Sequence, residues 1–289
     1  MNKTLLCLGF GFCAERLAGS LDASDWRVFG TTRNADKALA LKARGYRPVD
    51  PRDRDALAKA LTEASHILIS ASPAKGGDPF LGAAEKARAD REVPPDWIGY
   101  LSTTGVYGVS DGSMVNEDTP ARPVLERGKA RLEAELAWTA LAAKIGAPLS
   151  VFRLAGIYGP GRNAIQQLRT GTAKRIVKPG QVFNRIHVDD IAQILRASIA
   201  HPAADGIYNV ADDFASPPQD VIAYAAALIG MAPPPETPFE QADLSPMAKS
   251  FYEENKLIDN RRVKERLGIN LLYPDYRAGL AAILAESHQ

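Results

Sequence analysis

The stretch Leu8-Gly9-Phe10-Gly11-Phe12-Cys13-Ala14 decides the fold of this chain. Residues 4–8 form a continuous apolar run, which is typical of a buried strand, and residues 14–21 have the composition of a helix. Gly9 permits a tight turn between them, and Ala14 lets the helix pack closely on the strand. The stretch therefore predicts a strand, a turn and a helix, the opening unit of a parallel sheet.

Short apolar runs and helical segments continue to alternate after this unit. Strands are predicted at residues 26–30, 46–49, 66–70, 97–102 and 149–154, and helices at residues 36–43, 53–61 and 126–144. Apolar strands that alternate with helices form parallel sheets covered on both faces, and right-handed crossovers give them a doubly wound order. We therefore expect an α/β protein with a Rossmann doubly wound parallel sheet and a small C-terminal region.

The glycine turn has the spacing of a dinucleotide-binding site. Gly11 lets a pyrophosphate approach the backbone, and Phe12, Cys13 and Ala14 open a helix whose positive dipole end attracts phosphate. A second strand that ends about 20 residues later completes the fingerprint. We expect NADP(H) or NAD(H) to bind here; the alternative is a glycine-rich turn without a ligand.

The end of the second strand bears on the choice between NADP and NAD. Its sequence is Gly30-Thr31-Thr32-Arg33-Asn34, and we expect Thr31 and Arg33 to contact the cofactor. NAD sites usually place an acid here for the ribose 2′-hydroxyl, whereas an arginine suits a 2′-phosphate. Arg33 therefore favours NADP, the alternative being a solvated surface side chain.

The pattern loosens after residue 155. We predict a helix at residues 189–200 capped by Asp189, a strand at residues 207–210, helices at residues 218–229, 260–267 and 276–285, and a proline-rich break at residues 233–238. These segments are too short to build a core of their own. We therefore expect an NAD(P)-binding domain at residues 1–155, its sheet completed by segments near residues 181–212, and a mainly substrate-binding region at residues 156–289, interleaved with that domain.

Composition and charge argue against several classes of function. The chain has 289 residues and a net charge of +1, so nothing indicates binding to nucleic acid or to an anionic membrane. No apolar stretch is long enough to span a bilayer, and no signal-peptide pattern opens the chain. Cys7 and Cys13 indicate reduced thiols, and the histidines have no metal-ligand spacing. We expect a cytoplasmic protein without a metal.

Four motifs resemble those of the extended and atypical short-chain dehydrogenases/reductases, especially the NAD(P)-dependent epimerase/dehydratase branch. They are a strand end and loop at residues 101–108, a strand and loop at residues 152–161, Ile186-His187-Val188-Asp189-Asp190, and Gly206-Ile207-Tyr208-Asn209-Val210. The resemblance covers nearly the whole chain. It implies a nicotinamide cofactor and chemistry at a carbonyl or hydroxyl group of a small molecule.

The resemblance also implies roles for individual residues. Cofactor contacts are expected at Asp50 beside the adenine, at Ala71, Ser72 and Pro73 after the fourth strand, at Ser102, and at Leu154 and Ala155 near the nicotinamide. Thr103 matches the hydroxyl that hydrogen-bonds a substrate carbonyl or alcohol. These expectations concentrate the site at the carboxyl ends of the strands.

The catalytic pair of that family is missing. In the family a Tyr and a Lys lie four residues apart on the long helix, and the Lys lowers the pKa of the phenol so that the Tyr can carry a proton. With Glu135 aligned to the family's Glu, these positions hold Arg127 and Arg131. Arginine stays protonated, so it cannot replace the Tyr as acid/base, but it can stabilise an oxyanion or hold an anion. The alternative is an exposed, salt-bridged helix face.

Tyr107 and Tyr158 are candidate substitute proton donors, since both lie in loops at the carboxyl ends of strands, although packing is the favoured interpretation for each. For His187, which precedes a helix, we expect a structural hydrogen bond.

Two classes of function stay open. The first is an NAD(P)-dependent oxidoreductase or epimerase-like enzyme whose substrate is anionic or a sugar nucleotide, with residues 155–175 and 233–256 lining the pocket. The second is a catalytically degenerate NADP(H)-binding regulator or sensor. A homodimer through the long helices is an expectation from the resemblance alone.

Overall fold

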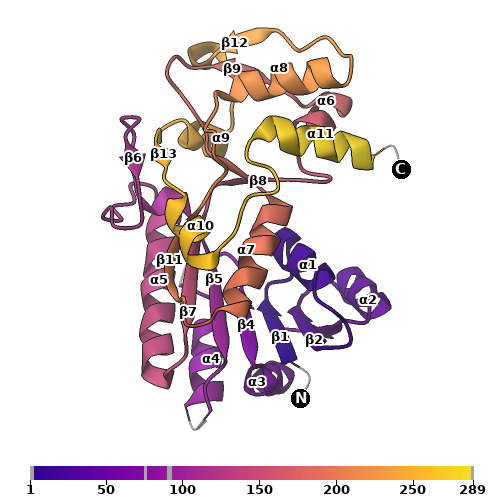
Figure 1. The fold of residues 1–289 in the computed structure, drawn as a ribbon, viewed down its shortest axis with the longest axis vertical. Coiled ribbons are helices and arrows are strands. Elements are labelled where there is room, and N and C mark those ends of the chain that lie inside the picture. Colours follow the sequence, from indigo (N-terminus) through magenta and orange to yellow (C-terminus); the bar gives the residue numbers. More distant parts are fainter. Residues whose placement is uncertain (1–2, 75–76, 90–92, 288–289) are drawn as a thin grey trace.

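The fold is built on seven parallel strands in one twisted sheet (Figure 1). The structure, a computed structural model, describes residues 3–74, 77–89 and 93–287. The strand order is β11-β7-β5-β4-β1-β2-β3. These strands are β1 (Lys3–Leu8), β2 (Trp26–Thr31), β3 (Arg47–Val49), β4 (His66–Ile69), β5 (Trp97–Thr103), β7 (Leu149–Leu154) and β11 (Gly206–Val210). The predicted Rossmann doubly wound sheet is therefore confirmed, with its switch point between β1 and β4.

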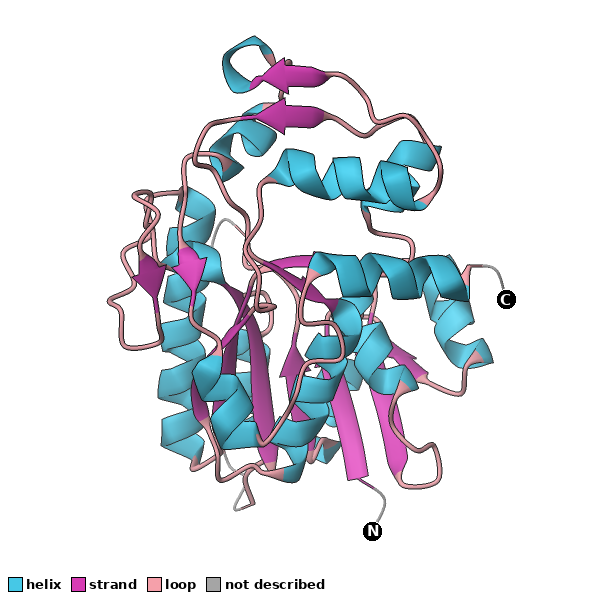
Figure 2. Ribbon diagram, turned by 45° about the horizontal axis from the view of Figure 1, so that its top comes forward, coloured by secondary structure: helices cyan, strands magenta, loops and turns pink. Residues whose placement is uncertain are grey.

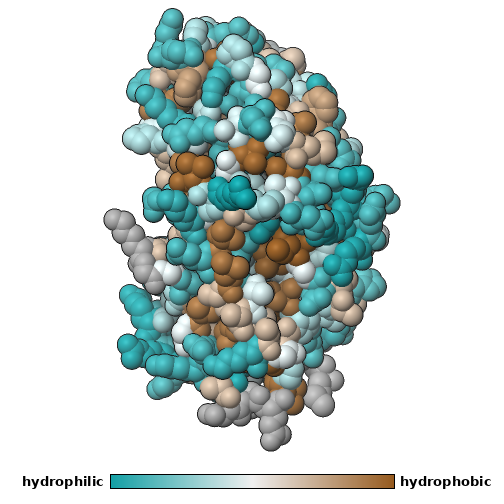
Figure 3. Space-filling view, turned by 90° about the vertical axis from the view of Figure 1, so that its left-hand side faces the viewer, coloured by the Kyte–Doolittle hydropathy of each residue, from teal (hydrophilic) through white to brown (hydrophobic). Residues whose placement is uncertain are grey.

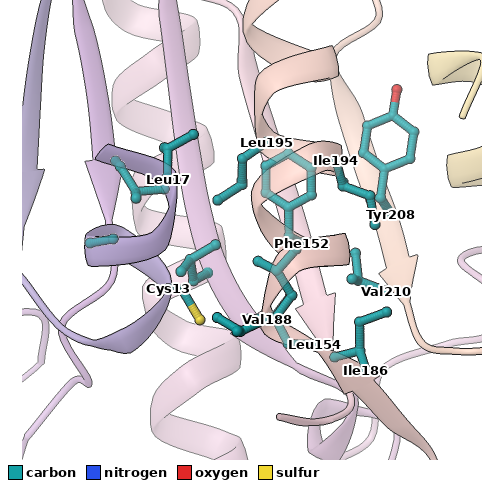
Figure 4. Close-up of a cluster of buried hydrophobic side chains, with 14 of the residues drawn as sticks. Cys13, Leu17, Phe152, Leu154, Ile186, Val188, Ile194, Leu195, Tyr208 and Val210 are labelled. Atoms are coloured by element: carbon teal, nitrogen blue, oxygen red, sulfur yellow. The ribbon is translucent and has the colours of Figure 1, made fainter. Parts of the chain in front are cut away.

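Helices cover both faces of this sheet. One face carries α1 (Phe12–Gly19), α2 (Ala35–Ala43) and α7 (Val188–Ala200), and the other carries α3 (Arg54–Glu63), α4 (Leu81–Arg88) and α5 (Glu126–Ile145). Figure 4 shows Leu17 of α1, Phe152 of β7 and Leu195 of α7 gathered between the helices and the sheet. All three side chains are fully buried, and burial of each contributes about 1.5–3 kcal/mol.

A smaller layer of short elements lies over the carboxyl ends of the strands (Figures 1 and 2). It contains β8 (Gly156–Tyr158), α6 (Ala164–Arg169), β9 (Arg175–Val177), β10 (Arg185–His187), α8 (Pro218–Leu228), β12 (Glu236–Pro238), the 3₁₀ turn Phe239–Gln241, α9 (Pro246–Phe251) and α11 (Tyr276–Glu286). Parallel pairing joins β10 to β8 and β12 to β9. This layer caps the carboxyl ends of the strands. The space between the layer and the sheet is therefore bordered by the loops in which such sheets bind ligands.

Three further elements connect this layer to the sheet. They are β6 (Met114–Val115), β13 (Leu257–Ile258) and α10 (Arg261–Leu267), and a 3₁₀ turn (Thr104–Val106) follows β5 directly. β13 pairs with β6 in parallel, which ties a late segment of the chain to the loop after β5.

One expectation from the sequence is wrong, and one helix was not predicted. Asp189 does not cap α7: the helix begins at Val188, and the Nδ1 atom of His187 accepts from the amide of Asp189 at 3.2 Å. Burial lowers the pKa of His187 to about 4, which keeps the ring neutral and able to accept, so its expected structural role is confirmed. Helix α4 was not predicted, because its apolar face consists mainly of alanines and gives a weak periodic signal.

Candidate functional site

The glycine turn leaves open space at the start of α1. Gly9 has φ +88°, and a Cβ there would stand 2.7 Å from the amide nitrogen of Ala71. Its own amide donates to the Thr31 hydroxyl at 2.6 Å. A Cβ at Gly11, in contrast, would meet no atom within 4 Å of the described chain, and no described side chain caps α1. Uncapped amides beside open space fit a bound pyrophosphate.

The next residues of α1 pack rather than react. Ala14 is fully buried, and Cys13 is buried in the core between α1 and α7. Burial raises the pKa of the Cys13 thiol to about 11, so the neutral thiol prevails at neutral pH despite the helix N-terminus. The half-buried Phe12 lies against Gly159. The predicted packing of helix on strand is thus observed.

The part of the expected cofactor site that would lie beside the adenine is exposed and charged. Asp50, just after β3, pairs with Arg52 at 2.6 Å, and the hydrogen bonds from Arg52 lower the pKa of Asp50 to about 2. Arg33 lies near enough to add to this lowering. Thr31 is buried and serves the turn through its bond to Gly9. Arg33 is therefore an exposed cation after the end of β2, near an ionised carboxylate.

A cavity of about 980 Å³ lies between the sheet and the overlying layer. Its lining includes eight of the predicted site residues, namely Ser72, Pro73, Ser102, Thr103, Arg127, Arg131, Leu154 and Ala155. The two segments predicted to form the pocket, residues 155–175 and 233–256, both contribute to it. Gly9, Gly11, Phe12, Cys13, Ala14, Thr31, Arg33, Asp50, Ala71 and Tyr107 do not line it.

A buried ion pair supports the strand ends that carry Thr103. The Thr103 hydroxyl accepts from the amide of Gly105 at 3.1 Å, which shapes the loop after β5. Next to it, the Ser102 hydroxyl donates to Glu135 of α5. Glu135 in turn pairs with Arg153 of β7 at 2.9 Å, with both side chains at most 5% exposed. The ion pair therefore links α5 to the ends of two adjacent strands.

Arg127 is an exposed residue whose guanidinium contacts α9. Its Nη1 atom donates to the Ser250 hydroxyl at 2.5 Å, and its guanidinium lies 4.4 Å from the centre of the Phe251 ring. Both contacts belong to the layer that covers the cavity. Arg127 thus adds a permanent positive charge to the wall of the cavity, at its exposed side.

Arg131 lies one helical turn further along α5. Its Nη1 atom donates to the Leu101 carbonyl at 2.7 Å, and its Nη2 atom donates to the Ser72 hydroxyl at 3.1 Å. It therefore ties α5 to β5 and to the loop after β4. The two arginines share the cavity, but their bonding partners differ.

The two candidate tyrosines have partners in the protein. Tyr107 is buried, and its hydroxyl donates to the Asn209 side chain at 2.7 Å, away from the cavity lining. Tyr158 does line the cavity, but its hydroxyl donates to the Asp275 carbonyl at 3.3 Å. Burial raises the pKa of both phenols, so both stay protonated at neutral pH.

The lining also contains charged residues that sequence reasoning missed. They are Arg162, Lys174, Arg185, Lys256 and Glu254; with the predicted Arg127 and Arg131 they bring the basic residues of the lining to six, against one carboxylate among the described residues, that of Glu254. Glu254 and Lys256 pair with each other. The excess of positive charge makes the cavity suited to an anionic ligand. No motif marked these residues, because they come from separate segments.

The fold and the site together define a Rossmann protein that binds a nicotinamide dinucleotide, with a basic cavity at the carboxyl end of its sheet. Residues 6–211 match the NAD dependent epimerase/dehydratase family, and the chain belongs to that family. No helix built from the described residues is long and apolar enough to cross a membrane.

Several proteins are similar to this chain over nearly its whole length. The protein YeeZ of Escherichia coli K12 is 29% identical over 94% of this chain and 97% of its own. The structure of a functionally unknown conserved protein from Silicibacter pomeroyi is 48% identical, with a TM-score of 0.89 and full coverage of both chains. The Thermus thermophilus UDP-glucose 4-epimerase in complex with NAD is 18% identical, with a TM-score of 0.77 and 99% coverage of both chains. This last likeness concerns the fold.

Proposed function

We propose that this protein is an NAD(P)-dependent oxidoreductase or epimerase that acts on a carbonyl or hydroxyl group of an anionic small molecule. The observation that carries the proposal is the cavity, because its lining contains both the Thr103 loop and six basic residues. A sugar nucleotide is the substrate class we favour, because its diphosphate suits this charge and the structurally similar Thermus enzyme is named for UDP-glucose.

The residues of the glycine turn fit the cofactor, as the open space at Gly11 indicates. We propose that Gly9, Gly11 and the first amides of α1 hold the pyrophosphate, and that Ser102 and the loops at residues 71–73 and 154–155 hold the nicotinamide half. The bound nicotinamide supplies hydride transfer. NADP is the preferred form, because Arg33 stands at the end of β2 with no acid in that turn.

Three side chains have proposed roles toward the substrate. The Thr103 hydroxyl donates to the reacting oxygen, and Arg127 stabilises negative charge on the substrate. Arg131 positions the loop after β4 relative to β5, through its hydrogen bonds to the Ser72 hydroxyl and the Leu101 carbonyl. None of the three can take up a proton at neutral pH.

A second candidate function is a regulator or sensor that binds NADP(H) without turnover. The arginines at the Tyr and Lys positions favour it, since a guanidinium stays protonated and Arg131 is already engaged with protein partners. Under this proposal the basic cavity binds an effector and not a substrate.

The two candidates differ in a turnover assay. The full chain is mixed with NADPH or NADH and a panel of carbonyl compounds, while absorbance of the reduced nicotinamide is followed. It is also mixed with NADP⁺ or NAD⁺ and UDP-glucose, and the sugar nucleotides are separated by chromatography, because an epimerase leaves no net reduced nicotinamide. The enzyme proposal predicts turnover, about 100-fold slower in Thr103→Ala and partly retained in Thr103→Ser, with nucleotide affinity unchanged. Tight nucleotide binding without turnover across the panel would favour the sensor.

Further proposals concern the location of the protein, its domains and its assembly. We propose a cytoplasmic protein, since Cys7 and Cys13 are free and buried. We also propose that residues 1–155 form the NAD(P)-binding domain, that segments near residues 181–212 complete its sheet, and that residues 156–289 mainly bind substrate.

We propose in addition a homodimer through α5, which is supported by Leu136, a residue that is 62% exposed on that helix. Figure 3 shows this side of the molecule, where apolar side chains gather in the middle of a polar surround.

A further inference from the structure

A carboxylate from the late part of the chain reaches the loop that carries Thr103. A Cβ placed on Gly105 would stand 3.4 Å from the Thr103 hydroxyl oxygen and 3.8 Å from Oε1 of Glu254. Both oxygens therefore lie close to one point beside the loop after β5. The Glu254 side chain is 14% exposed and lines the cavity with Thr103.

Lys256 forms an ion pair with Glu254. It follows Glu254 by two residues, in the segment between α9 and β13. The Nζ atom of Lys256 donates to Oε2 of Glu254, and the Lys256 side chain is 7% exposed. One carboxylate oxygen is thus bound to an ammonium group, while Oε1 is the oxygen that faces Gly105.

Hydrogen bonds to its backbone hold this segment in place. The side-chain amide of Gln181 donates to the Glu254 carbonyl at 2.8 Å, and the side-chain amide of Asn184 donates to the Lys256 carbonyl at 2.8 Å. The amide of Gly112 donates to the Asn255 carbonyl at 2.9 Å, and β13 continues the contact with β6. Fixed backbone on both sides of the carboxylate is what a preorganised acid/base requires.

We propose, on the basis of the proposed enzymatic function, that Glu254 is the acid/base of this site and replaces the missing tyrosine, with Lys256 as the positioning residue that holds it. In alcohol oxidation the substrate O–H bond breaks and its proton passes to Glu254. The electron pair left on oxygen forms the carbonyl as the C–H bond gives up hydride to the oxidised nicotinamide. In reduction protonated Glu254 returns the proton to the oxygen.

Other titratable groups in the cavity are less suited to this role. The Tyr158 hydroxyl is bonded to the Asp275 carbonyl, Tyr252 packs between Phe183 and Phe239, and Tyr276 packs against Tyr224. The cations that line the cavity with Glu254 are Lys256 on its own segment, Arg127 and Arg131 on α5, Arg162 and Lys174 near α6, and Arg185 on β10.

The first test needs no known substrate. Protein with ¹³C-labelled glutamate carboxyl groups is titrated by NMR, and the Glu254 resonance is assigned from its loss in Glu254→Gln. Calorimetry first shows which pair binds more tightly, NAD⁺ and NADH or NADP⁺ and NADPH. The NMR titration is then carried out once with the oxidised and once with the reduced form of that pair. Because the oxidised nicotinamide carries a positive charge, the proposal predicts a Glu254 pKa at least about one unit lower with the oxidised form. Equal pKa values with both bound forms would overturn the proposal.

The second test uses turnover of the substrate found by the carbonyl and UDP-glucose panel. Glu254→Gln should lower the rate at least about 100-fold with nucleotide affinity unchanged, Glu254→Asp should recover part of it, and the exposed neighbour Glu253→Gln should behave as the wild type. A rate for Glu254→Gln within about threefold of the wild type would refute the acid/base role. If calorimetry detects no nucleotide binding at all, the proposed function itself fails.

Discussion

Arg131 of α5 donates a hydrogen bond to the carbonyl oxygen of Leu101 at 2.7 Å, inside the strand that leads to Thr103. The same guanidinium bonds the Ser72 hydroxyl at 3.1 Å. One side chain therefore fastens the long helix to β5 and to the loop after β4, two segments proposed to touch the cofactor. A planar group with several donors can hold both at once, which a lysine ammonium at this position would do less well.

Arg131→Ala is expected to weaken nucleotide binding about 10-fold, because hydrogen bonds to charged groups contribute about 1.5–3 kcal/mol and both loops lose their tie. Isothermal calorimetry measures the change. Lys129→Ala is the matched control, since Lys129 pairs only with the exposed Glu126 on the same helix among the described residues. Unchanged affinity in Arg131→Ala would show that the two contacts do not shape the cofactor site.

Arg33→Ala should weaken binding of NADPH more than binding of NADH, because a guanidinium at this turn contacts only the 2′-phosphate form strongly. The expected difference is about 10-fold, read from titrations of both nucleotides. Lys42→Ala, a change of charge on the exposed side of α2, controls for long-range electrostatics. An equal loss for both nucleotides would remove Arg33 from the specificity site.

Glu135→Gln should lower the free energy of unfolding by about 3–5 kcal/mol, because it leaves Arg153 as an unpaired buried charge. Urea denaturation followed by circular dichroism gives the value. Glu126→Gln breaks a solvent-exposed pair with Lys129 and should change stability by less than about 0.5 kcal/mol. A loss below about 1 kcal/mol in Glu135→Gln would mean that the pair is not a structural support.

Acidification should destabilise the protein partly through His66. Burial lowers the pKa of this histidine to about 4, against an unfolded value near 6.5. Between these values the unfolded chain binds a proton that the folded chain does not, so stability is lost as pH falls through the window. Asp212 acts in the opposite direction, because burial raises its pKa to about 8.

The contribution of His66 is therefore read as a difference. The free energy of unfolding is measured from pH 7 to pH 4 for the wild type and for His66→Gln. The variant should show the weaker loss on acidification, by up to about 1.4 kcal/mol per pH unit. Parallel curves would contradict the assigned pKa.

The sequence predicted the sheet well because its strands are buried on both faces and stand out as apolar runs. The glycine turn was equally clear, since only glycine adopts the φ of +88° at residue 9 without strain. Helix α7 was found but its cap was misassigned, because a neutral histidine can accept an amide proton as an aspartate does.

The charged part of the cavity could not be read from the sequence. Glu254 and Lys256 belong to a short segment with no periodic signal, which runs directly into the pairing of the two-residue strands β6 and β13. Contacts between segments so far apart in the chain depend on tertiary packing and not on local pattern. Arg127 and Arg131 were found from the family resemblance, with Glu135 aligned to the family's Glu, but their partners Ser250 and Ser72 were not.

The account rests on a bound dinucleotide at Gly11, and one substitution tests it most directly. Gly11 has φ −96°, and a Cβ there meets open space, so Gly11→Val should fold with a melting temperature close to that of the wild type. The added side chain fills the space proposed for the pyrophosphate. Calorimetry with NAD⁺, NADH, NADP⁺ and NADPH should detect binding to the wild type and at least a roughly 100-fold loss in Gly11→Val. Equal affinities for the two proteins would contradict the central claim.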